Sequence, residues 1–347
     1  MNSYNNTILV TGAGSYSAIN TIKSLKLIGR YRIIATDIYP QSVGSFRSDS
    51  AYVIPQESDS GMYILKLLEI CEKEDVSLLI PSIDAEIPYI FKSREKFEKL
   101  GVKLLIGNQL LVRIGCDKYA LYEYLKSNRL PYLKSFNLDE KKIALDTLTF
   151  PIVLKPKSSW GQKGYHLINS KKELNYFIST VTNKSSEYMI QEYVNDDEGE
   201  FTNSVAVAND GQILGCICIK RKLVRGASVE MIIDDFPEVK KQMIEIAKKI
   251  NSPGPVNIQC RLRRGKAMVF EINPRFSTTN IVRAECGFNE VGILVDNFLT
   301  GNKTIINEYE RKVAMAFLEY ALVDVKDIED YKSLGYTKAN AEINNRL

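Results

Sequence analysis

The sequence has little of what a zinc centre requires. Its 347 residues include one histidine, His166, and six cysteines that lack the paired spacing of a metal site. Cys216 and Cys218 lie two apart in an apolar run, so we expect them to share one face of a strand and to fill core. A zinc centre is therefore not expected. We interpret His166, which follows a glycine loop, as structural.

Long apolar runs and blocks of like charge are also missing. No apolar run approaches the roughly 20 residues of a membrane span, and the first residues lack the basic, apolar and small-residue regions of a secretion signal. The 46 basic and 42 acidic residues are spread along the chain, which gives a net charge of +4. We therefore expect a cytoplasmic protein that binds neither nucleic acid nor membranes.

The sequence does contain an alternation of apolar runs and amphipathic stretches. From the start to about residue 110, "TILVT", "RIIATD", "SLLIPS" and "VKLLIG" alternate with helical stretches, a pattern typical of a parallel sheet with helices on both faces. The predicted fold class is α/β, and a chain of this length suits two or three packed units. We expect units at 1–111, 112–195 and 196–310, and a polar, helix-prone extension without a predicted site at 311–347.

The stretch "TGAGSYSA", residues 11–18, follows an apolar run and opens a helix. Gly12 and Gly14 match the first two glycines of the dinucleotide-binding fingerprint, but Ser17 stands in the third place. Asp37 follows the next strand, where an acidic residue would hold a ribose hydroxyl, although an Asp there is also ordinary turn chemistry. Taken alone, these residues leave nicotinamide or flavin binding open.

The stretch "VNIQCRLRRGKAMVFEINPRF" predicts a hairpin that carries several side-chain oxygens. Arg264-Gly265 signals the turn, and Glu271 and Asn273 are spaced by two, which places them on one face of a strand. Gln259 can join them from the other strand. Oxygen ligands on a rigid ladder suit magnesium that is also held by substrate phosphates. The alternative is an outward polar face beside a turn-forming Asn-Pro.

Two further stretches carry features of a nucleotide site. Lys155 ends an apolar strand and precedes a loop of small residues, in which N–H groups can fold over phosphates although the spacing is not that of a P-loop. The strand "YMIQEYV", residues 188–194, leads into an acidic loop before Glu200. Such a hinge could offer backbone groups to a purine and a carboxylate to a ribose. The small residues of the loop are Ser158, Ser159, Gly161 and Gly164.

In their order along the chain, "CDK", "VLKPKSSWGQKG", "IQEYV", "GEFTNSV", "VNIQ" and "FEINPRFS" resemble motifs of the ATP-grasp superfamily. The resemblance covers about residues 5 to 300 and is to the branch that looks like a short carbamoyl-phosphate synthase large subunit. It implies a Rossmann-like N-terminal domain followed by the two α+β halves of an ATP-grasp fold. It also implies that the "TGAGS" turn is structural and binds no dinucleotide.

The resemblance further implies a role for each matching residue. Lys118 and Lys155 would hold ATP phosphates under the closing loop of Ser158, Ser159, Gly161 and Gly164. Glu200 would bind ribose and Arg275 would face the transferring phosphoryl group. The adenine would lie against Gln191, Glu192, Tyr193 and Val194, read by the backbone of Glu192 and Val194. Magnesium, for which manganese can substitute, would be held by Gln259, Glu271 and Asn273.

Other candidates each have a plain alternative. Arg225 could reach the γ-phosphate or a carboxylate substrate, or lie on a solvated strand face. Asp84 and Glu86 follow a buried strand and could contact the acceptor amine, or could cap a helix. Ser277 could touch an acyl phosphate or make a local backbone bond. Trp160 is expected to pack the closed loop.

These residues predict an ATP-dependent ligase that joins a small carboxylate, such as an amino acid, to an amine through an acyl phosphate. ATP and magnesium are the expected cofactors, and a homodimer is expected. We do not expect carbamoyl phosphate synthesis or carboxylation, because the sequence has no second synthetase half, glutaminase segment or biotin-linked region. The alternatives are a small-molecule kinase and a catalytically silent nucleotide-binding regulator, although Lys155, Glu271, Asn273 and Arg275 favour an enzyme.

Overall fold

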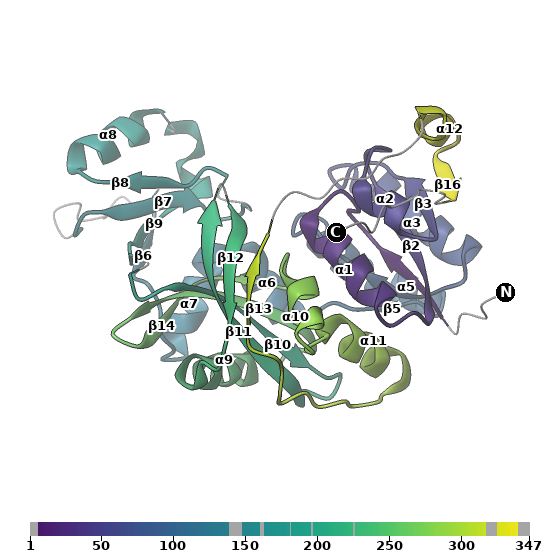
Figure 1. Ribbon diagram of the computed structural model, residues 1–347. Helices are drawn as coiled ribbons and strands as arrows, with labels where there is room; N and C mark the ends of the chain where they lie inside the picture. The colour runs from purple at the N-terminus through teal and green to yellow at the C-terminus, as the bar shows by residue number, and fades with distance from the viewer. Residues whose placement is uncertain are drawn as a thin grey trace.

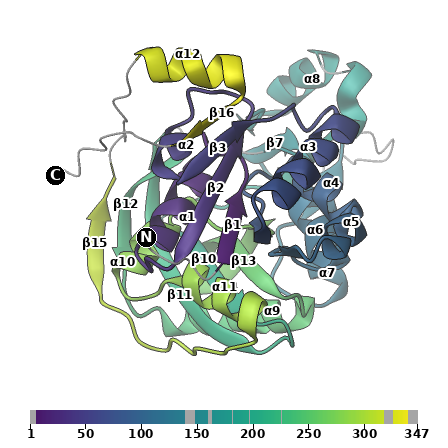
Figure 2. The ribbon, with the colours of Figure 1, turned by 90° about the vertical axis from the view of Figure 1, so that its right-hand side faces the viewer.

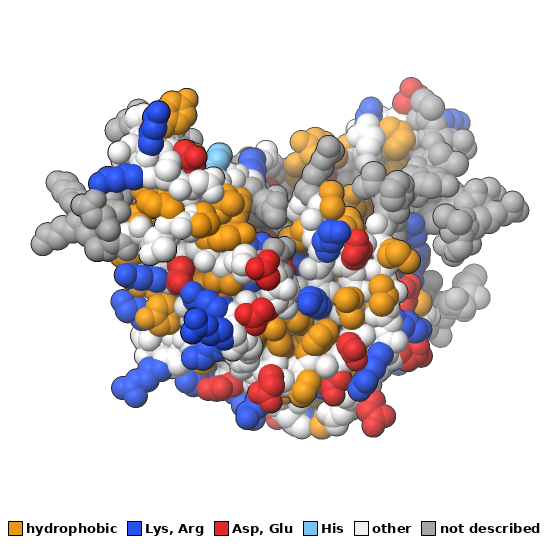
Figure 3. Space-filling view, turned by 60° about the vertical axis from the view of Figure 1, so that its left-hand side comes forward, with side chains coloured by type: hydrophobic (Ala, Val, Ile, Leu, Met, Phe, Trp, Pro, Cys, Tyr) orange, Lys and Arg blue, Asp and Glu red, His pale blue; other side chains and the backbone are white. Residues whose placement is uncertain are grey.

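The computed structural model describes residues 6–138, 148–159, 163–180, 182–195, 197–224, 226–316 and 325–338. Over these residues the strands form two six-stranded sheets and one four-stranded sheet (Figure 1). No helix in the described part of the chain is long and apolar enough to cross a membrane. Figure 3 shows basic and acidic side chains mixed over the face that it draws, so neither sign of charge dominates that face.

The first sheet is formed mainly by the N-terminal part of the chain, in the order β16-β3-β2-β1-β4-β5. Its strands from β1 to β5 are parallel, and both faces are buried: Ile8 and Val10 pack on one side, Leu9 on the other. The parallel strands are β1 (Asn6–Val10), β2 (Tyr31–Asp37), β3 (Ser50–Val53), β4 (Val76–Ile80) and β5 (Lys103–Leu104).

Helices cover both faces of this sheet, as the alternating pattern predicts. Figure 2 shows α1 on one side of the sheet and the α3 to α6 group on the other. Ser15 caps α1 by accepting from the N–H of Ala18, and Asp59 caps α3 in the same way. The helices are α1 (Tyr16–Lys26), α2 (Val43–Arg47), α3 (Ser60–Lys73), α4 (Ile87–Lys92), α5 (Arg94–Lys99) and α6 (Gln109–Cys116).

The four-stranded sheet is antiparallel and lies in the middle of the sequence. Its order is β6-β9-β7-β8, and Leu154, Leu174 and Ile190 form its small core. Its elements, with the helix that precedes it, are α7 (Lys118–Ser127), β6 (Ser135–Asn137), β7 (Ile152–Pro156), β8 (His166–Ile168), α8 (Lys171–Thr180), a 3-10 turn (Thr182–Glu187) and β9 (Tyr188–Glu192). His166 stacks on Phe177, with ring centroids 4.7 Å apart.

The second six-stranded sheet is antiparallel, in the order β14-β13-β10-β11-β12-β15. Arg264 and Gly265 turn the β13–β14 hairpin with positive φ, and Cys216, Cys218 and Cys260 are buried together in one core of this sheet. The elements are β10 (Glu200–Val207), β11 (Ile213–Val224), β12 (Ala227–Ile233), α9 (Pro237–Ile250), β13 (Gly254–Arg263), β14 (Lys266–Asn273), α10 (Asn280–Glu285), α11 (Glu290–Thr300) and β15 (Lys312–Met315).

The first sheet and the second six-stranded sheet are joined through α1, α10 and α11. Val291 and Leu294 of α11 share a core with Ile22 of α1. Ser17 is buried here, and its hydroxyl donates to the carbonyl oxygen of Phe276 at 2.8 Å. The residue that departs from the dinucleotide fingerprint therefore holds two parts of the chain together.

The segment after residue 310 belongs to both six-stranded sheets, which the sequence did not predict. Strand β15 extends the second sheet beside β12, and β16 (Tyr336–Lys338) pairs with β3 of the first (Figure 1). Helix α12 (Val325–Leu334) lies between them in sequence and buries Tyr331 completely. The described part of this segment is thus bound to the rest of the fold by strand pairing and by core contacts.

Candidate active site

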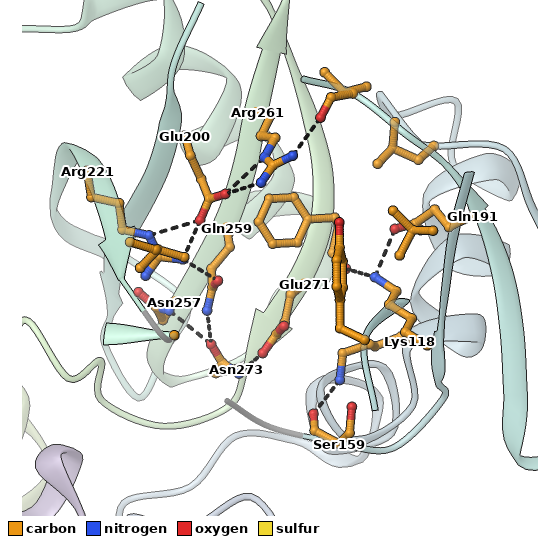
Figure 4. Close-up of a pocket in the computed structure, with 18 of the residues that line it drawn as sticks. Lys118, Ser159, Gln191, Glu200, Arg221, Asn257, Gln259, Arg261, Glu271 and Asn273 are labelled. Atoms are coloured by element: carbon orange, nitrogen blue, oxygen red, sulfur yellow. Dashed lines mark hydrogen bonds and ion pairs between the residues drawn. The ribbon is translucent and has the colours of Figure 1, made fainter. Parts of the chain in front are cut away.

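One pocket lies where the four-stranded sheet faces the β13–β14 hairpin, and most predicted site residues line it (Figure 4). They come from α7, β7, β9, β10, β13 and β14 and from the loops after β7, β9 and β14, which are far apart in sequence. The predicted residues that line it are Lys118, Lys155, Ser159, Gln191, Glu192, Tyr193, Val194, Glu200, Gln259, Glu271, Asn273, Arg275 and Ser277. Cationic and oxygen-bearing side chains therefore meet in one cavity.

Some predicted residues do not line this pocket. Gly161 and Arg225, like Trp160, lie outside the described residues. Asp84, Glu86, Ser158 and Gly164 are described but are not part of the pocket wall. Gly164 has a φ of +74°, and a Cβ there would lie 2.8 Å from the ring of Pro156, so the turn requires glycine.

Two lysines enter the pocket from different elements. Lys155, at the end of β7, is buried and donates to the side-chain oxygen of Gln191 at 2.8 Å and to the Phe270 carbonyl at 3.3 Å. Lys118 begins α7, capped by Asp117, and donates to the Ser159 carbonyl. Burial, helped by the nearby Lys118 charge, lowers the pKa of Lys155 to about 7 although Glu271 acts in the opposite direction.

Nucleotide binding is therefore expected to take up a proton. If ATP phosphates bind beside Lys155, as the resemblance implies, they favour its charged form, so the lysine of the complex stays protonated at about pH 8 while the empty one is mostly neutral. Calorimetry in two buffers of different ionisation enthalpy should show uptake approaching one proton per ATP at about pH 8 and almost none at about pH 6, and ATP affinity should fall as the pH rises above 7. Lys155→Arg should abolish the uptake. Equal heats in both buffers at the higher pH would exclude this linkage.

Glu200 is held between two arginines at the start of β10. Its carboxylate accepts from Arg221 of β11 and from Arg261 of β13, each at 2.9 Å. Arg261 also donates to the Val194 carbonyl at 2.7 Å, so it links the predicted ribose carboxylate to the predicted adenine segment. Both arginines were missed in the sequence, because only the strand register places them opposite Glu200.

The predicted metal residues lie side by side on the β13–β14 hairpin. The register pairs Gln259 with Glu271 and Asn257 with Asn273. Asn273 donates to Glu271 at 2.9 Å and accepts from Gln259 at 2.9 Å and from Asn257 at 3.0 Å. Asn257 was not predicted, although it lies two residues before Gln259 on the same strand face.

The donor set fits magnesium better than a metal that needs several charged ligands. Over the described residues, no group of three or more His, Cys, Asp and Glu side chains is placed to hold a metal. Burial alone would raise the pKa of Glu271, but Lys118, the Asn273 hydrogen bond, Lys155 and Arg275 together lower it. A single ionised carboxylate with nearby amide oxygens is what magnesium uses when phosphates supply its other ligands.

Arg275 follows the hairpin and reaches toward the first sheet. Its guanidinium donates to Asp84 at 2.6 Å, and Asp84 lies in the loop after β4. Both side chains are mostly buried, at 13 % exposure. Ser277 exchanges a hydrogen bond with the hydroxyl of Thr279 and accepts from the Thr279 N–H at 3.2 Å, so it makes local bonds while lining the pocket.

Two protein families match separate parts of the chain. Residues 8–105 match the family described as "PylC-like, N-terminal domain". Residues 184–321 match the family described as "ATP-grasp in the biosynthetic pathway with Ter operon". The chain carries an ATP-grasp domain. The predicted fold class is therefore confirmed: the chain is α/β, with an N-terminal unit followed by an ATP-grasp fold.

The curated relatives of this chain are distant. It is 21% identical over 300 residues to the carbamoyl phosphate synthase large chain of Pseudothermotoga lettingae, covering 78% of this chain and 26% of that protein. It is 24% identical over 292 residues to the formate-dependent phosphoribosylglycinamide formyltransferase of Prochlorococcus marinus, covering 79% and 71%. The chain thus spans about a quarter of the carbamoyl phosphate synthase chains that it matches.

Solved structures share the ATP-grasp fold over most of the chain. The N5-carboxyaminoimidazole synthetase of Staphylococcus aureus, complexed with ADP, has a TM-score of 0.72 at 18% identity and covers 95% of this chain and 86% of its own. The biotin carboxylase domain dimer of the Hydrogenobacter thermophilus 2-oxoglutarate carboxylase, with MgADP and bicarbonate, has a TM-score of 0.69 at 16% identity and covers 87% and 71%. At these identities the likeness establishes the fold.

Glu86, like Asp84, lies outside the pocket. It is buried, and its carboxylate accepts from the N–H groups of Ser82 and Ile83 at 2.8 and 2.9 Å and from the hydroxyls of Thr11 and Tyr63. Burial raises its pKa. Glu86 therefore closes the loop that carries Asp84, and we do not propose it as a contact of the acceptor amine.

Side chains of the N-terminal unit itself occupy the space around the glycine turn. The N–H of Gly14 donates to Asp37 at 2.6 Å, and Asp37 also accepts from the N–H of Tyr39. A Cβ at Gly12 would lie 2.5 Å from Ile83. The carboxylate of Asp37 thus takes the N–H group that a pyrophosphate would need, which argues against dinucleotide binding.

Proposed function

We propose that this chain is an ATP-dependent ligase that joins a small carboxylate to an amine through an acyl phosphate and releases ADP and phosphate. The observation that carries the proposal is the convergence of Lys118, Lys155, Glu271 and Arg275 in one pocket, with Arg275 bound to Asp84 of the N-terminal sheet. Phosphates need the cations and the metal needs the carboxylate, and the ion pair of Arg275 with Asp84 connects the pocket to the N-terminal sheet.

The proposed reaction has two steps. An oxygen of the substrate carboxylate forms a bond to the γ-phosphorus while the bond from that phosphorus to the β-phosphate oxygen breaks and ADP leaves. The amine then forms a bond to the acyl carbon, the bond to the phosphate oxygen breaks, and the amine loses a proton. Because phosphoryl transfer depends mainly on positioning and charge stabilisation, the protein needs no nucleophile of its own.

We assign roles to the pocket residues on this basis. Lys118 and Lys155 bind phosphates, Glu200 binds ribose, and Gln191, Glu192, Tyr193 and Val194 contact adenine. Arg275 stabilises charge on the transferred phosphoryl group, and Asp84 contacts the acceptor amine. Ser158, Ser159 and Gly164 belong to the loop over the phosphates, and Ser277 contacts the acyl phosphate. For Gly161 and Arg225, outside the described residues, the same phosphate and substrate roles remain proposals from the sequence.

The cofactors we propose are ATP and magnesium, for which manganese can substitute. Glu271, with amide oxygens of Asn273 and Gln259, would hold the metal, which supplies neutralisation of phosphate charge when bound. The ADP and MgADP in the matched structures support this choice, and the dimer among them supports a homodimer. We also propose small-molecule substrates, a cytoplasmic location and the division 1–111, 112–195, 196–310 and 311–347.

Phosphate release and hydroxylamine trapping test this proposal together. The purified protein is given ATP and magnesium with pools of amino acids and amino sugars, and phosphate is measured with each pool alone and in pairs. A ligase should need both a carboxylate and an amine, and hydroxylamine should replace the amine and give a hydroxamate from the acyl phosphate. A stable phosphorylated product without hydroxamate would indicate a kinase, and ATP binding without turnover would indicate a regulator.

A further inference from the structure

A second groove lies between the end of α7, helix α9 and the turn of the β13–β14 hairpin, elements that Figure 1 shows close together. Its volume is about 1360 Å³, whereas a typical small-molecule site has roughly 300–1,000 Å³. None of the described residues that line it also lines the candidate active-site pocket. We call it the basic groove, because its charged lining consists of Lys126, Arg129, Lys241, Arg263, Arg264 and Lys266 against Glu238 and Glu245.

Most of this positive charge is available to a ligand, and apolar side chains lie between the cations. Within the described part of the chain, Arg263 is the only one of the six basic residues in an ion pair, which it forms with Glu192. The apolar lining consists of the buried Leu130, Ile246 and Met268 and the half-buried Pro131 and Tyr132. The basic groove therefore suits a ligand that has both negative charge and apolar surface.

Two of these arginines stand where the backbone favours glycine. Arg129 has a φ of +55° after α7, and the next N–H, of Leu130, donates to the Leu125 carbonyl at 2.9 Å, the arrangement in which glycine usually ends a helix. Arg264 has a φ of +52° as the first residue of the hairpin turn, where asparagine, aspartate or glycine is usual. No described residue accepts a hydrogen bond from either guanidinium. The local structure thus gives no reason for arginine at either position, and an anionic ligand would.

Helix α9 holds both of these turns in place. At the end of α7, Lys249 donates to the carbonyl oxygen of Asn128 at 2.9 Å. At the hairpin, the side-chain oxygen of Gln242 accepts from the N–H of Ala267 at 3.0 Å. The carboxylate of Glu198, which does not line the groove, accepts from both N–H groups of the hairpin turn at 2.6 and 2.9 Å. The two arginines are thus carried on turns that are fixed before any ligand binds, which lowers the entropic cost of binding.

We propose that the basic groove docks an acidic segment of a partner protein, whose carboxylates pair with the lysines and arginines and whose apolar side chains contact the apolar lining. The excess of basic over acidic side chains selects for acidic residues in the partner. A peptide fits better than a nucleic-acid strand, because it supplies apolar side chains and need not place a charge opposite Glu238 or Glu245, whereas phosphates recur at every nucleotide. This inference goes beyond the proposed function and does not rest on it.

A segment docked in the basic groove would lie next to the candidate active-site pocket, because one wall separates the two. Met268 lines the groove and packs with Leu133 and Val194, which line the pocket. Arg263 lines the groove and pairs with Glu192, which also lines the pocket. The partner would therefore contact the residues that support the proposed adenine segment from behind.

Fluorescence anisotropy with three labelled probes of equal length tests this proposal without nucleotide or turnover. The first probe is a glutamate-rich peptide with leucines at helical spacing, the second has serines in place of the leucines, and the third is a single-stranded oligothymidylate. We expect the leucine peptide to bind at least about tenfold more tightly than the other two, and more weakly as salt rises from about 50 to about 200 mM. Absence of binding, or equal or tighter binding of either other probe, would overturn the proposal.

The decisive variant is Arg129→Gly with Arg264→Gly, which removes two cations and relieves the backbone at both positions. We expect it to melt at the same or a higher temperature than the wild type, and to bind the leucine peptide at least about tenfold more weakly. Lys241→Ala with Lys266→Ala should weaken binding in the same direction and serves if the first variant does not fold. Lys92→Ala with Lys99→Ala, which removes two exposed cations of the N-terminal unit, is the matched control and should bind normally. Wild-type affinity in a folded groove variant would contradict the proposal.

Discussion

The Glu271→Gln protein is expected to turn over more than about a hundredfold more slowly than the wild type at saturating magnesium. Glutamine keeps the size of the side chain and an oxygen that accepts from Asn273, so the variant loses mainly the negative charge. That charge is what would attract the cation between the protein and the ATP phosphates. Phosphate release with the substrates found by the pool assay measures the rate, and calorimetry with and without magnesium measures nucleotide affinity.

The expected loss should be specific to magnesium-dependent steps. Magnesium should strengthen nucleotide binding by the wild type and have little effect on the variant, while metal-free ADP binding stays similar in both. Glu74→Gln is a suitable control, because Glu74 follows α3, is partly buried, pairs with Arg32 of β2 and lies outside the pocket. Near-normal turnover by Glu271→Gln, with an unchanged magnesium requirement, would show that this carboxylate holds no catalytic metal.

The sequence could reveal this carboxylate because its partners are close along the chain. Glu271 and Asn273 share a strand face at a spacing of two, and the Arg264-Gly265 turn brings Gln259 opposite them. The spacing of these three residues along the chain was therefore enough to predict that their side chains lie together. The glycine turn was harder to interpret, because it needed a tertiary contact: Ser17 is accounted for only by its bond to Phe276, which lies 259 residues further along the chain.

Other parts of the site depend on strand register, which cannot be predicted from the spacing of residues along the chain. Arg221 and Arg261 lie opposite Glu200 only because β11 and β13 flank β10 in one particular alignment. Shifting either strand by one residue would turn the arginine to the other face of the sheet. Arg225, which follows β11, was the basic residue of this stretch predicted from the sequence, whereas nearby Lys222 is exposed and pairs with Glu230.

Short strands at the end of the chain were also beyond prediction. β15 has four residues and β16 has three, which is too few for a periodic pattern to be recognised. Their partners, β12 and β3, lie far away in sequence, so their pairing depends on the packed fold rather than on local preference. Glu86 shows the opposite case, in which a position at the carboxyl end of a strand suggested a ligand contact and the side chain instead closes its own loop.

Arg275→Ala is expected to lower turnover by about a hundredfold to a thousandfold while ATP affinity changes by only a few-fold. The wild-type guanidinium lines the pocket beside Lys118 and Lys155 and donates to Asp84. Because we propose that the two lysines bind the phosphates of the ground state, we expect Arg275 to contribute most when charge spreads over the phosphoryl group in transfer. Single-turnover phosphate release measures the chemical step, and calorimetry measures the affinity.

Asp84→Asn tests whether Arg275 stabilises the transferred phosphoryl group or only joins the N-terminal sheet to the hairpin. It removes the charge that pairs with Arg275 but keeps the guanidinium in the pocket. If Arg275 served only to join the N-terminal sheet to the hairpin, the two variants would lose the same activity and the same thermal stability. We expect instead that Asp84→Asn mainly raises the KM for the amine, whereas Arg275→Ala mainly lowers kcat. An Arg275→Ala protein with a near-normal kcat would leave the proposed ligase without a group to stabilise the transferred phosphoryl, and the residues after Asn273 would then be a structural end of the hairpin.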